Sequence, residues 1–238
     1  MKDKVIAIHQ PNFLPWLGYF YKMVHCDIFV FLDDVQYTKN SFINRNCIKT
    51  DQGAYWLTVP VKYEFGKGIN EICIIDSNWK TKHLRTLKQY YKKAKYFDEV
   101  FDLIEKCYRN NILNLSIFNV GIIWSILDYL KIKVNTTFSS DYNIIEKSTG
   151  RLIKLVESLK GTKYLSGFGG NNYQETDSFK NYNIDLIYSE FSHPTYAQLW
   201  GGDFIKNLSI IDILFNCGTD EVRRMLGIEA SNGISATY

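Results

Sequence analysis

The first 32 residues contain a pattern typical of a parallel β-sheet. Two short apolar runs, at 5–8 and 28–32, flank a loop with two prolines and a segment, 16–24, whose apolar residues have helical spacing. Within ~30 residues this order predicts a βαβ unit, because parallel strands need a long crossover connection. The loop at 9–15 then lies at the carboxyl end of a strand, where open α/β sheets bind ligands.

Strand and helix patterns alternate near both ends of the chain, which predicts an α/β fold with a parallel or mixed sheet and flanking helices. We expect one α/β domain over residues 1–228, a helical region at about 78–130 and a frayed C-terminal tail at 229–238. Further strands are predicted at 44–49, 54–61, 69–76, 134–139, 163–166 and 185–188, and further helices at 78–94, 97–109, 114–130, 150–159, 171–181, 208–215 and 219–226.

Composition excludes several classes of protein. The five cysteines form no C-x-x-C pair, so neither a zinc site nor a thioredoxin-like motif is expected, and no metal ligand is assigned. No apolar run approaches the ~18 residues of a membrane span, and the opening apolar run is too short for a signal peptide. The sequence therefore predicts a cytoplasmic protein that does not enter the membrane, and it leaves the oligomeric state open.

Charge gives one local signal. The chain has 28 basic and 25 acidic residues, a balance that does not demand a nucleic-acid partner. A basic cluster nevertheless occupies 80–95, on a predicted helix. This cluster fits either a solvated helix face or a surface for the phosphates of tRNA. Its members are Lys80, Lys82, Arg85, Lys88, Lys92, Lys93 and Lys95.

Polar side chains gather in the loop after the first strand. His9, Gln10 and Asn12 stand among Pro11 and Pro15, and Trp16 begins the predicted helix. The free N–H groups of a helix N-terminus favour anions at this position. We therefore expect a binding site here; the alternative is a stiff strand-to-helix turn packed with aromatic residues. The 16% aromatic content supplies walls for either a core or a ligand.

The second predicted strand ends in Asp33 and Asp34, at the same edge of the sheet. Paired aspartates there fit a cation site, orientation of a substrate hydroxyl, or a simple turn. The segment Asn44-Arg45-Asn46 follows. Arg45 is suited to hold a phosphate or carboxylate through two parallel hydrogen bonds, and its alternative role is a structural salt bridge to one of the two aspartates.

Two later loops carry further candidates. Ser166 and Gly167 begin a glycine-rich segment after a predicted strand, but the segment lacks the Gly-Lys-Ser/Thr ending of a phosphate-binding P-loop. It fits a tight turn or a cradle for phosphate or sugar. His193 lies in a Pro-fixed aromatic loop with Tyr196 and Gln198. It is a candidate general base if it shares a cleft with His9, and otherwise a structural histidine.

Several of these segments resemble the WbqC-like family, over about residues 4–227. The resemblance implies a bacterial protein often associated with O-antigen or other surface-glycan gene sets. The opening motif at 7–18, Ala-Ile-His-Gln-Pro-Asn-Phe-Leu-Pro-Trp-Leu-Gly, is the longest match. Shorter matches are Asn44-Arg45-Asn46, Trp56-Leu57-Thr58-Val59-Pro60, Tyr164-Leu165-Ser166-Gly167, and His193-Pro194 with Tyr196 and Gln198 through Asn207-Leu208-Ser209.

The order of elements near the N-terminus is also similar to the nucleotidyltransferase and pantothenate-synthetase group. This resemblance implies a nucleotidyltransferase-like (HUP-like) core with a helical insertion. That group usually carries two histidines, separated by two residues, at the start of the first helix. The present chain has Leu-Pro-Trp-Leu-Gly at 14–18, so its sequence departs from the group at the catalytic pair.

The glycan context and the polar loops favour a transferase that forms an amide on a nucleotide-linked amino sugar by acyl or aminoacyl (for example glycyl) transfer. His9 or His193 accepts a proton from the sugar ammonium, and Asn12, Asn44 or Arg45 stabilises the developing oxyanion. No cofactor is assigned. The acyl donor is left open among a thioester, an aminoacyl-tRNA and an adenylate formed with ATP. Substrate-binding candidates are Gln10, Asn12, Trp16, Asp33, Asn44, Trp56, Ser166, Gly167, Tyr196 and Gln198.

Two alternatives belong to other functional classes. An ATP-dependent ligase or nucleotidyltransferase predicts binding of ATP or CTP at the loop of residues 11–18. A non-catalytic sugar-binding protein of the same pathway predicts that both histidines are dispensable.

Overall fold

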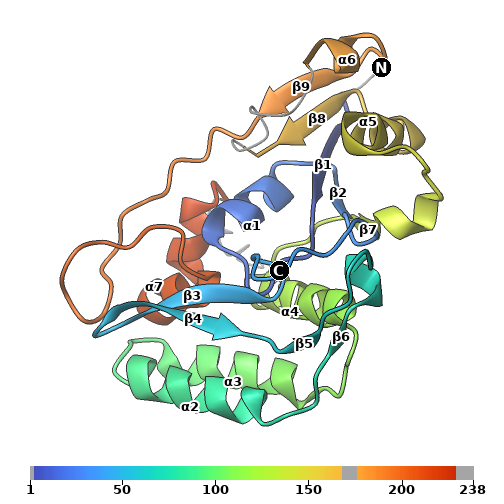
Figure 1. Ribbon diagram of the computed structural model, residues 1–238. Helices are drawn as coiled ribbons and strands as arrows, with labels where there is room; N and C mark the ends of the chain where they lie inside the picture. Colours follow the sequence, from blue (N-terminus) through green and yellow to red (C-terminus); the bar gives the residue numbers. More distant parts are fainter. Residues whose placement is uncertain (1–2, 168–175, 229–238) are drawn as a thin grey trace, which may run out of the picture.

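A five-stranded parallel sheet lies at the centre of the computed structural model, which describes residues 3–167 and 176–228 (Figure 1). Its strand order is β7-β2-β1-β8-β9. Every pairing in it is parallel, with Ile6 opposite Ile28 and His9 opposite Phe31. The strands are β1 (Val5–His9), β2 (Ile28–Phe31), β7 (Thr136–Phe138), β8 (Lys163–Ser166) and β9 (Asp185–Tyr188).

Strand β1 is the switch point of the sheet. The chain leaves β1 through α1 (Leu17–Val24) and pairs β2 on one side, whereas β8 pairs on the other side. The connection that leaves β1 therefore leads to β2 on one side, and the connection that leaves β8 leads to β9 on the other side. Open α/β sheets place their ligand crevice at such a point.

Helices cover both faces of the sheet. Alternate strand residues point to opposite faces. Ile6 and Ile8 belong to one apolar cluster with Ile153 of α5 (Ser148–Ser158) and Phe179 of α6 (Thr176–Lys180). On the other face, Phe29 contacts Tyr19 of α1 at a ring-centroid distance of 5.3 Å. The α/β class and the helices on both sides of a parallel sheet are as predicted.

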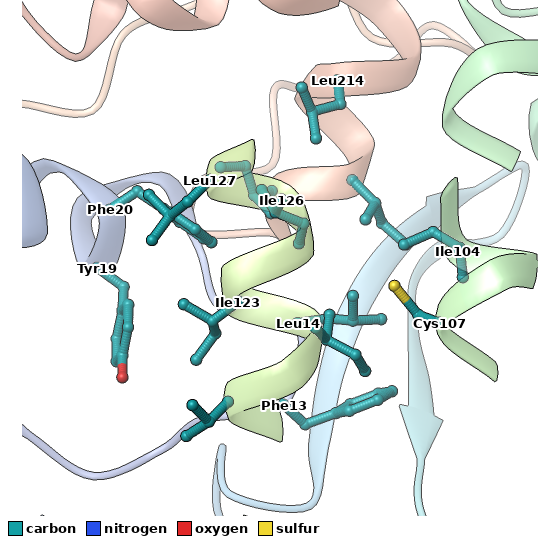
Figure 2. Packing of buried hydrophobic residues seen from close by; sticks show 14 of the residues in the cluster. Phe13, Leu14, Tyr19, Phe20, Ile104, Cys107, Ile123, Ile126, Leu127 and Leu214 are labelled. Carbon is teal, nitrogen blue, oxygen red and sulfur yellow. The ribbon is translucent and has the colours of Figure 1, made fainter. Parts of the chain in front are cut away.

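A long insertion connects β2 to β7. It contains the hairpin of β3 (Arg45–Thr50) and β4 (Gly53–Thr58), the pair β5 (Val61–Lys62) and β6 (Cys73–Ile74), and three helices. The helices are α2 (Trp79–Tyr91), α3 (Phe97–Arg109) and α4 (Leu115–Tyr129). Figure 2 shows α4 with Phe20 of α1 on one side and Ile104 of α3 on the other. The buried side chains of α4 join this insertion to the core around the sheet.

Local chemistry explains where the observed elements differ from the predicted ones. The predicted strand at 54–61 is divided after Thr58, since Pro60 has no N–H for a ladder. The predicted strand at 69–76 begins instead with a 3-10 turn, η1 (Ile69–Glu71), because the Glu71 carboxylate accepts a hydrogen bond of 2.8 Å from the Gly68 amide. Another 3-10 turn, η2 (Ser139–Tyr142), follows β7.

The last two predicted helices form one element, α7 (Ile210–Met225), which is kinked at Gly218. A φ of 75° at Gly218 is disfavoured for residues with a Cβ, and a Cβ there would lie 2.6 Å from the Tyr96 ring. The predicted helix at 171–181 falls partly outside the described residues, and α6 is its described part. The predicted tail at 229–238 lies wholly outside them.

Candidate functional site

A cavity of about 440 Å³ opens at the carboxyl ends of β1 and β8. Its volume falls within the range of roughly 300–1,000 Å³ that is usual for small-molecule sites. Four of the predicted residues line it: His9 and Gln10 after β1, and Ser166 and Gly167 at the end of β8. The remaining described lining residues are Ile8, Lys22, Leu32, Val35, Ser148, Thr149, Arg151, Leu152 and Tyr164.

The His9 ring is fixed by its neighbours. It lies 4.8 Å from the ring of Tyr19, centroid to centroid, and the Tyr19 hydroxyl donates to the carbonyl of Gln10 at 3.1 Å. The Nδ1 atom of His9 is buried and makes no hydrogen bond within the described residues. Burial lowers the pKa of His9 well below its usual value, and the positive charge of Lys22 lowers it further. At neutral pH this ring is therefore an uncharged base.

The loop between β1 and α1 is held by buried polar side chains. Asn119 of α4 donates to the carbonyls of Pro11 at 2.8 Å and Ile43 at 2.7 Å. Asn46 and Ser209 donate to the carbonyl of Leu14 at 2.7 and 2.8 Å. These bonds fix Leu14 at a φ of 41°, which non-glycine residues rarely adopt. A rigid loop keeps His9 and Gln10 in place.

Lys22 is the residue that the sequence interpretation missed most clearly. It extends from α1 to the cavity, is only 4% exposed, and donates to the carbonyl of Ile8 at 2.8 Å. Burial lowers its pKa to about 7. The sequence spacing could have indicated this, because Lys22 follows Tyr19 by three residues and so lies on the same, apolar side of the helix.

Helix α5 supplies a second set of polar groups. Ser148 and Thr149 begin the helix and line the cavity. The residue before them, Lys147, provides no side-chain cap, so the amides of the first turn keep their capacity to bind an anion. The sequence predicted this helix from residue 150, whereas it begins at Ser148. Arg151, one turn into the helix, also lines the cavity and forms an ion pair with Asp34.

Asp33 has a structural position. It is 4% exposed, and its carboxylate accepts hydrogen bonds from Ser139 Oγ at 3.1 Å and from Ser140 N and Oγ at 3.1 and 2.9 Å. These bonds tie the end of β2 to the end of β7. Asp33 does not line the cavity, and its oxygens are already occupied by donors from the fold.

Trp16 adjoins the cavity through a narrow pocket of about 60 Å³, which it lines with His9, Lys22 and Phe191 among others. Gly18 leaves room for the indole, since a Cβ there would lie 2.3 Å from a Trp16 ring atom. His193 lies parallel to Trp16 at a centroid distance of 6.5 Å. Its Nδ1 atom interacts with the carbonyl of Pro194 at 2.8 Å, and it does not line the cavity.

Tyr196 and Gln198 belong to a separate, largely buried network. The Tyr196 hydroxyl donates to Asp212 Oδ2 at 2.7 Å. Gln198 donates to the carbonyl of Ile205 at 2.8 Å and accepts from Lys49 Nζ at 3.2 Å. Burial raises the pKa of the Asp212 carboxyl. This network fixes the loop before α7 and lies apart from the residues that line the cavity.

The remaining predicted residues lie on or beside the hairpin of β3 and β4 or in the loop after β1. The guanidinium carbon of Arg45 is 4.2 Å from the centroid of Trp56. Asn44 donates to the carbonyl of Val59 at 3.1 Å. Asn12 is 6% exposed. None of these four residues is among the described residues that line the cavity.

Comparison with known proteins gives the family. The family model described as "WbqC-like protein family" matches residues 10–224. The chain belongs to the WbqC-like family. A relative in this comparison is the "Uncharacterized protein Rv1507c" of Mycobacterium tuberculosis (strain ATCC 25618 / H37Rv), which is 37% identical over 221 residues, covering 91% of this chain and 95% of that protein. No solved structure gives a significant match.

Most of the candidate site of this WbqC-like chain lies within the region that the family model matches. The match includes Gln10, Lys22, Arg151 and Ser166. Across residues 3–167 and 176–228, no group of three or more His, Cys, Asp or Glu side chains is arranged to hold a metal ion. None of the helices in those ranges is long and apolar enough to cross a membrane.

Proposed function

We propose that this chain is a transferase that forms an amide on a nucleotide-linked amino sugar. The proposal combines the chemistry of the cavity with the surface-glycan context that resemblance to the WbqC-like family implies. It assigns the phosphates of the sugar nucleotide to the cationic side of the cavity and the sugar amine to His9.

The observation that carries the proposal is the charge of the cavity. Lys22 and Arg151 line it together with the first turn of α5, and its described lining contains no Asp or Glu. Arg151 is neutralised in part by Asp34, which leaves Lys22 as the cation of the lining that has no acidic partner among the described residues. A phosphate group satisfies this arrangement, because charge-assisted hydrogen bonds offset the cost of a buried ammonium.

His9 has the properties of the required base. An amino sugar is protonated in water and must lose a proton before its nitrogen attacks an acyl carbon. The uncharged His9 ring accepts that proton. The new C–N bond forms first, and the bond between the acyl carbon and the donor's leaving group then breaks. His9 returns its proton to that leaving group, and the second proton of the attacking nitrogen is released to solvent, which leaves a neutral amide. Gln10 supplies an uncharged donor for the oxyanion of the intermediate.

The experiment is a transfer assay followed by mass spectrometry. Purified protein is incubated with a nucleotide-linked 4-amino-deoxysugar and, separately, an acyl thioester, an aminoacylated RNA, or ATP with an amino acid. The expected result is a sugar nucleotide whose mass has increased by the acyl group. The His9→Asn variant is expected not to form this product, since the substitution removes the base. His25→Asn, at the exposed end of α1, is the matched control and is expected to keep it.

Absence of product with every donor class would contradict the proposal. A rise in melting temperature with the sugar nucleotide alone, unchanged by His9→Asn, would then indicate a sugar-binding protein. A rise with ATP or CTP and magnesium, but not with the sugar nucleotide, would indicate the nucleotidyltransferase alternative.

A further inference from the structure

Among residues 3–167 and 176–228, Arg45 is a cation without an anionic partner. The sequence offered Asp33 and Asp34 as salt-bridge partners, but Asp33 is bound by Ser139 and Ser140, and Asp34 pairs with Arg151. Within the described residues Arg45 makes no ion pair, and its Nε atom is buried without a hydrogen-bond partner. Its guanidinium is stacked on Trp56 and so is held in a fixed orientation.

Exposed aromatic rings surround this cation. Trp56 is 42% exposed and lies 6.0 Å from Phe42, which is 49% exposed. Tyr63 is 41% exposed and lies 6.0 Å from the ring of Tyr37. Tyr37 is 2% exposed, and its hydroxyl is buried without a hydrogen-bond partner in the described chain.

One further charge, that of Lys39, belongs to this region. Lys39 Nζ lies 5.9 Å from the centroid of the Tyr63 ring. The charge of Arg45 acts on Tyr37 and opposes the rise that burial causes in the pKa of that hydroxyl. Arg45 and Tyr37 are therefore close enough to interact. We call the set Tyr37, Lys39, Phe42, Arg45, Trp56 and Tyr63 the Arg45–Trp56 surface.

A basic helix lies against the same hairpin. The Tyr91 hydroxyl of α2 accepts a hydrogen bond of 3.0 Å from the amide of Lys49 in β3, and Figure 1 shows α2 beneath β4. Residues 79–95 contain no Asp or Glu. Their basic side chains at six positions are exposed, and none of the six takes part in an ion pair within the described residues. The six are Lys82, Arg85, Lys88, Lys92, Lys93 and Lys95.

We propose that the Arg45–Trp56 surface binds a single-stranded RNA segment, and that the exposed basic residues at 82–95 add electrostatic attraction for its phosphates. Several exposed rings beside unpaired cations suit successive bases, because every base has a flat face for stacking and is followed by a phosphate. A single small ligand would favour an enclosed pocket, whereas these rings are spread over an open surface. An anionic membrane would use the lysines but has no flat groups to stack on Arg45, Trp56 and Phe42.

The bound RNA is then the acyl donor of the transfer reaction. This assignment of the donor rests on the proposed function. An RNA that carries an acyl group as an ester of its terminal ribose delivers it to the amine. The sugar nitrogen forms a bond to the acyl carbon, and the bond between that carbon and the ribose oxygen breaks. One proton of the former ammonium ends on the ribose hydroxyl, and the second is released to solvent.

Binding is tested with a fluorescein-labelled single-stranded RNA of roughly ten nucleotides, by anisotropy, over a range of salt concentrations. The full chain is expected to bind, more weakly at higher salt. Arg45→Gln and Trp56→Leu are each expected to weaken binding by about tenfold. Arg224→Gln and Trp124→Leu, at exposed positions elsewhere, are the matched controls and are expected to leave it within about twofold of the unsubstituted chain. Circular-dichroism melting of each variant establishes that it is folded.

Unchanged RNA binding in both folded variants of the surface would overturn the proposal. Binding to vesicles of three parts phosphatidylcholine and one part phosphatidylserine, without binding to the RNA, would also overturn it and indicate a membrane contact. The experiments distinguish failure of the proposed transferase function from failure of the RNA-binding inference. RNA binding that depends on Arg45, without amide formation from any donor, removes only the proposed function. Amide formation from a thioester that is unaffected by Arg45→Gln, together with no RNA binding, removes only this inference.

Discussion

The ammonium group of Lys22 donates a hydrogen bond of 2.8 Å to the main-chain oxygen of Ile8. Ile8 directly precedes His9, so the bond brings a cation from α1 to the carboxyl end of β1, beside the candidate base. One carbonyl does not replace the water that surrounds an exposed ammonium, and burial therefore lowers the pKa of Lys22 to about 7. This pKa couples both stability and ligand binding to pH near neutrality.

Replacing Lys22 by Met is expected to stabilise the fold at and below pH 7. The folded pKa lies at about 7, against 10.5 for the free side chain, so the folded state binds the proton less well than the unfolded state does. The charged form thus carries a penalty that is complete below pH ~7 and disappears as the pH rises towards 10.5. A gain on the order of a few kcal/mol is expected at pH 6, and it should shrink by pH 10. Urea unfolding at both pH values measures it; an equal gain at the two would contradict the argument.

The affinity for an anionic ligand is expected to fall as the pH rises above 7. A phosphate binds most tightly when Lys22 is protonated, so binding takes up a proton in the pH range where the free lysine is neutral. Calorimetric titration of a sugar nucleotide at pH 6 and pH 9 measures the change, with proton uptake obtained from buffers of different ionisation enthalpy. Lys22→Met is expected to weaken binding at pH 6 and to remove the pH dependence between the two values. A dependence that persists in this variant would place the titrating group elsewhere.

Local patterns allowed much of the sheet to be predicted. The βαβ unit of β1, α1 and β2 follows from apolar runs a few residues long, and the apolar α4 reflects burial within the core. The pairing of β2 with β7 joins segments more than 100 residues apart, which no local pattern encodes. Pairs with such large separations are set by tertiary packing and by bonds like those of Asp33 with the turn η2.

The site was predicted less completely, for a physical reason. His9, Gln10, Ser166 and Gly167 directly end or follow strands of the parallel sheet, so the switch-point rule applies to them. Lys22 and Arg151 are long basic side chains on helices, and such residues usually lie in solvent. Only the packing of α1 and α5 on opposite faces of the sheet brings both to one cavity. Arg45 and Trp56 were predicted to share a site with His9, whereas the hairpin of β3 and β4 brings their side chains into contact with each other, outside the described lining of the cavity.

Asp33→Asn is expected to destabilise the fold by about 1–3 kcal/mol, because an amide cannot accept from Ser139 and Ser140 at both of its heavy atoms. The loss reflects separation of β2 from β7 and is measured by urea unfolding. Asp128→Asn, at an exposed position on α4, is the matched control and is expected to change stability by less than about 0.5 kcal/mol. Equal effects of the two substitutions would show that the bonds of Asp33 contribute nothing specific.

The substitution Gly18→Ala tests whether a steric clash with Trp16 outweighs the higher helix propensity of alanine. Alanine in a helix is favoured over glycine by roughly 1 kcal/mol, so open sites gain stability from this change. At Gly18 the new Cβ would lie 2.3–2.8 Å from three atoms of the Trp16 ring, which must move. Gly121 in α4 has no atom within 4 Å of a built Cβ and serves as the control.

Melting temperatures are therefore expected to move in opposite directions, with Gly121→Ala more stable and Gly18→Ala less stable than the unsubstituted chain. Trp16 lines the narrow pocket beside His9 and lies parallel to His193. Displacement of its indole should also change the tryptophan fluorescence and lower the rate of transfer in Gly18→Ala alone. A stabilised Gly18→Ala variant with unchanged fluorescence would show that the indole does not need the space that glycine leaves, and Trp16 would then lose its place in the wall of the site.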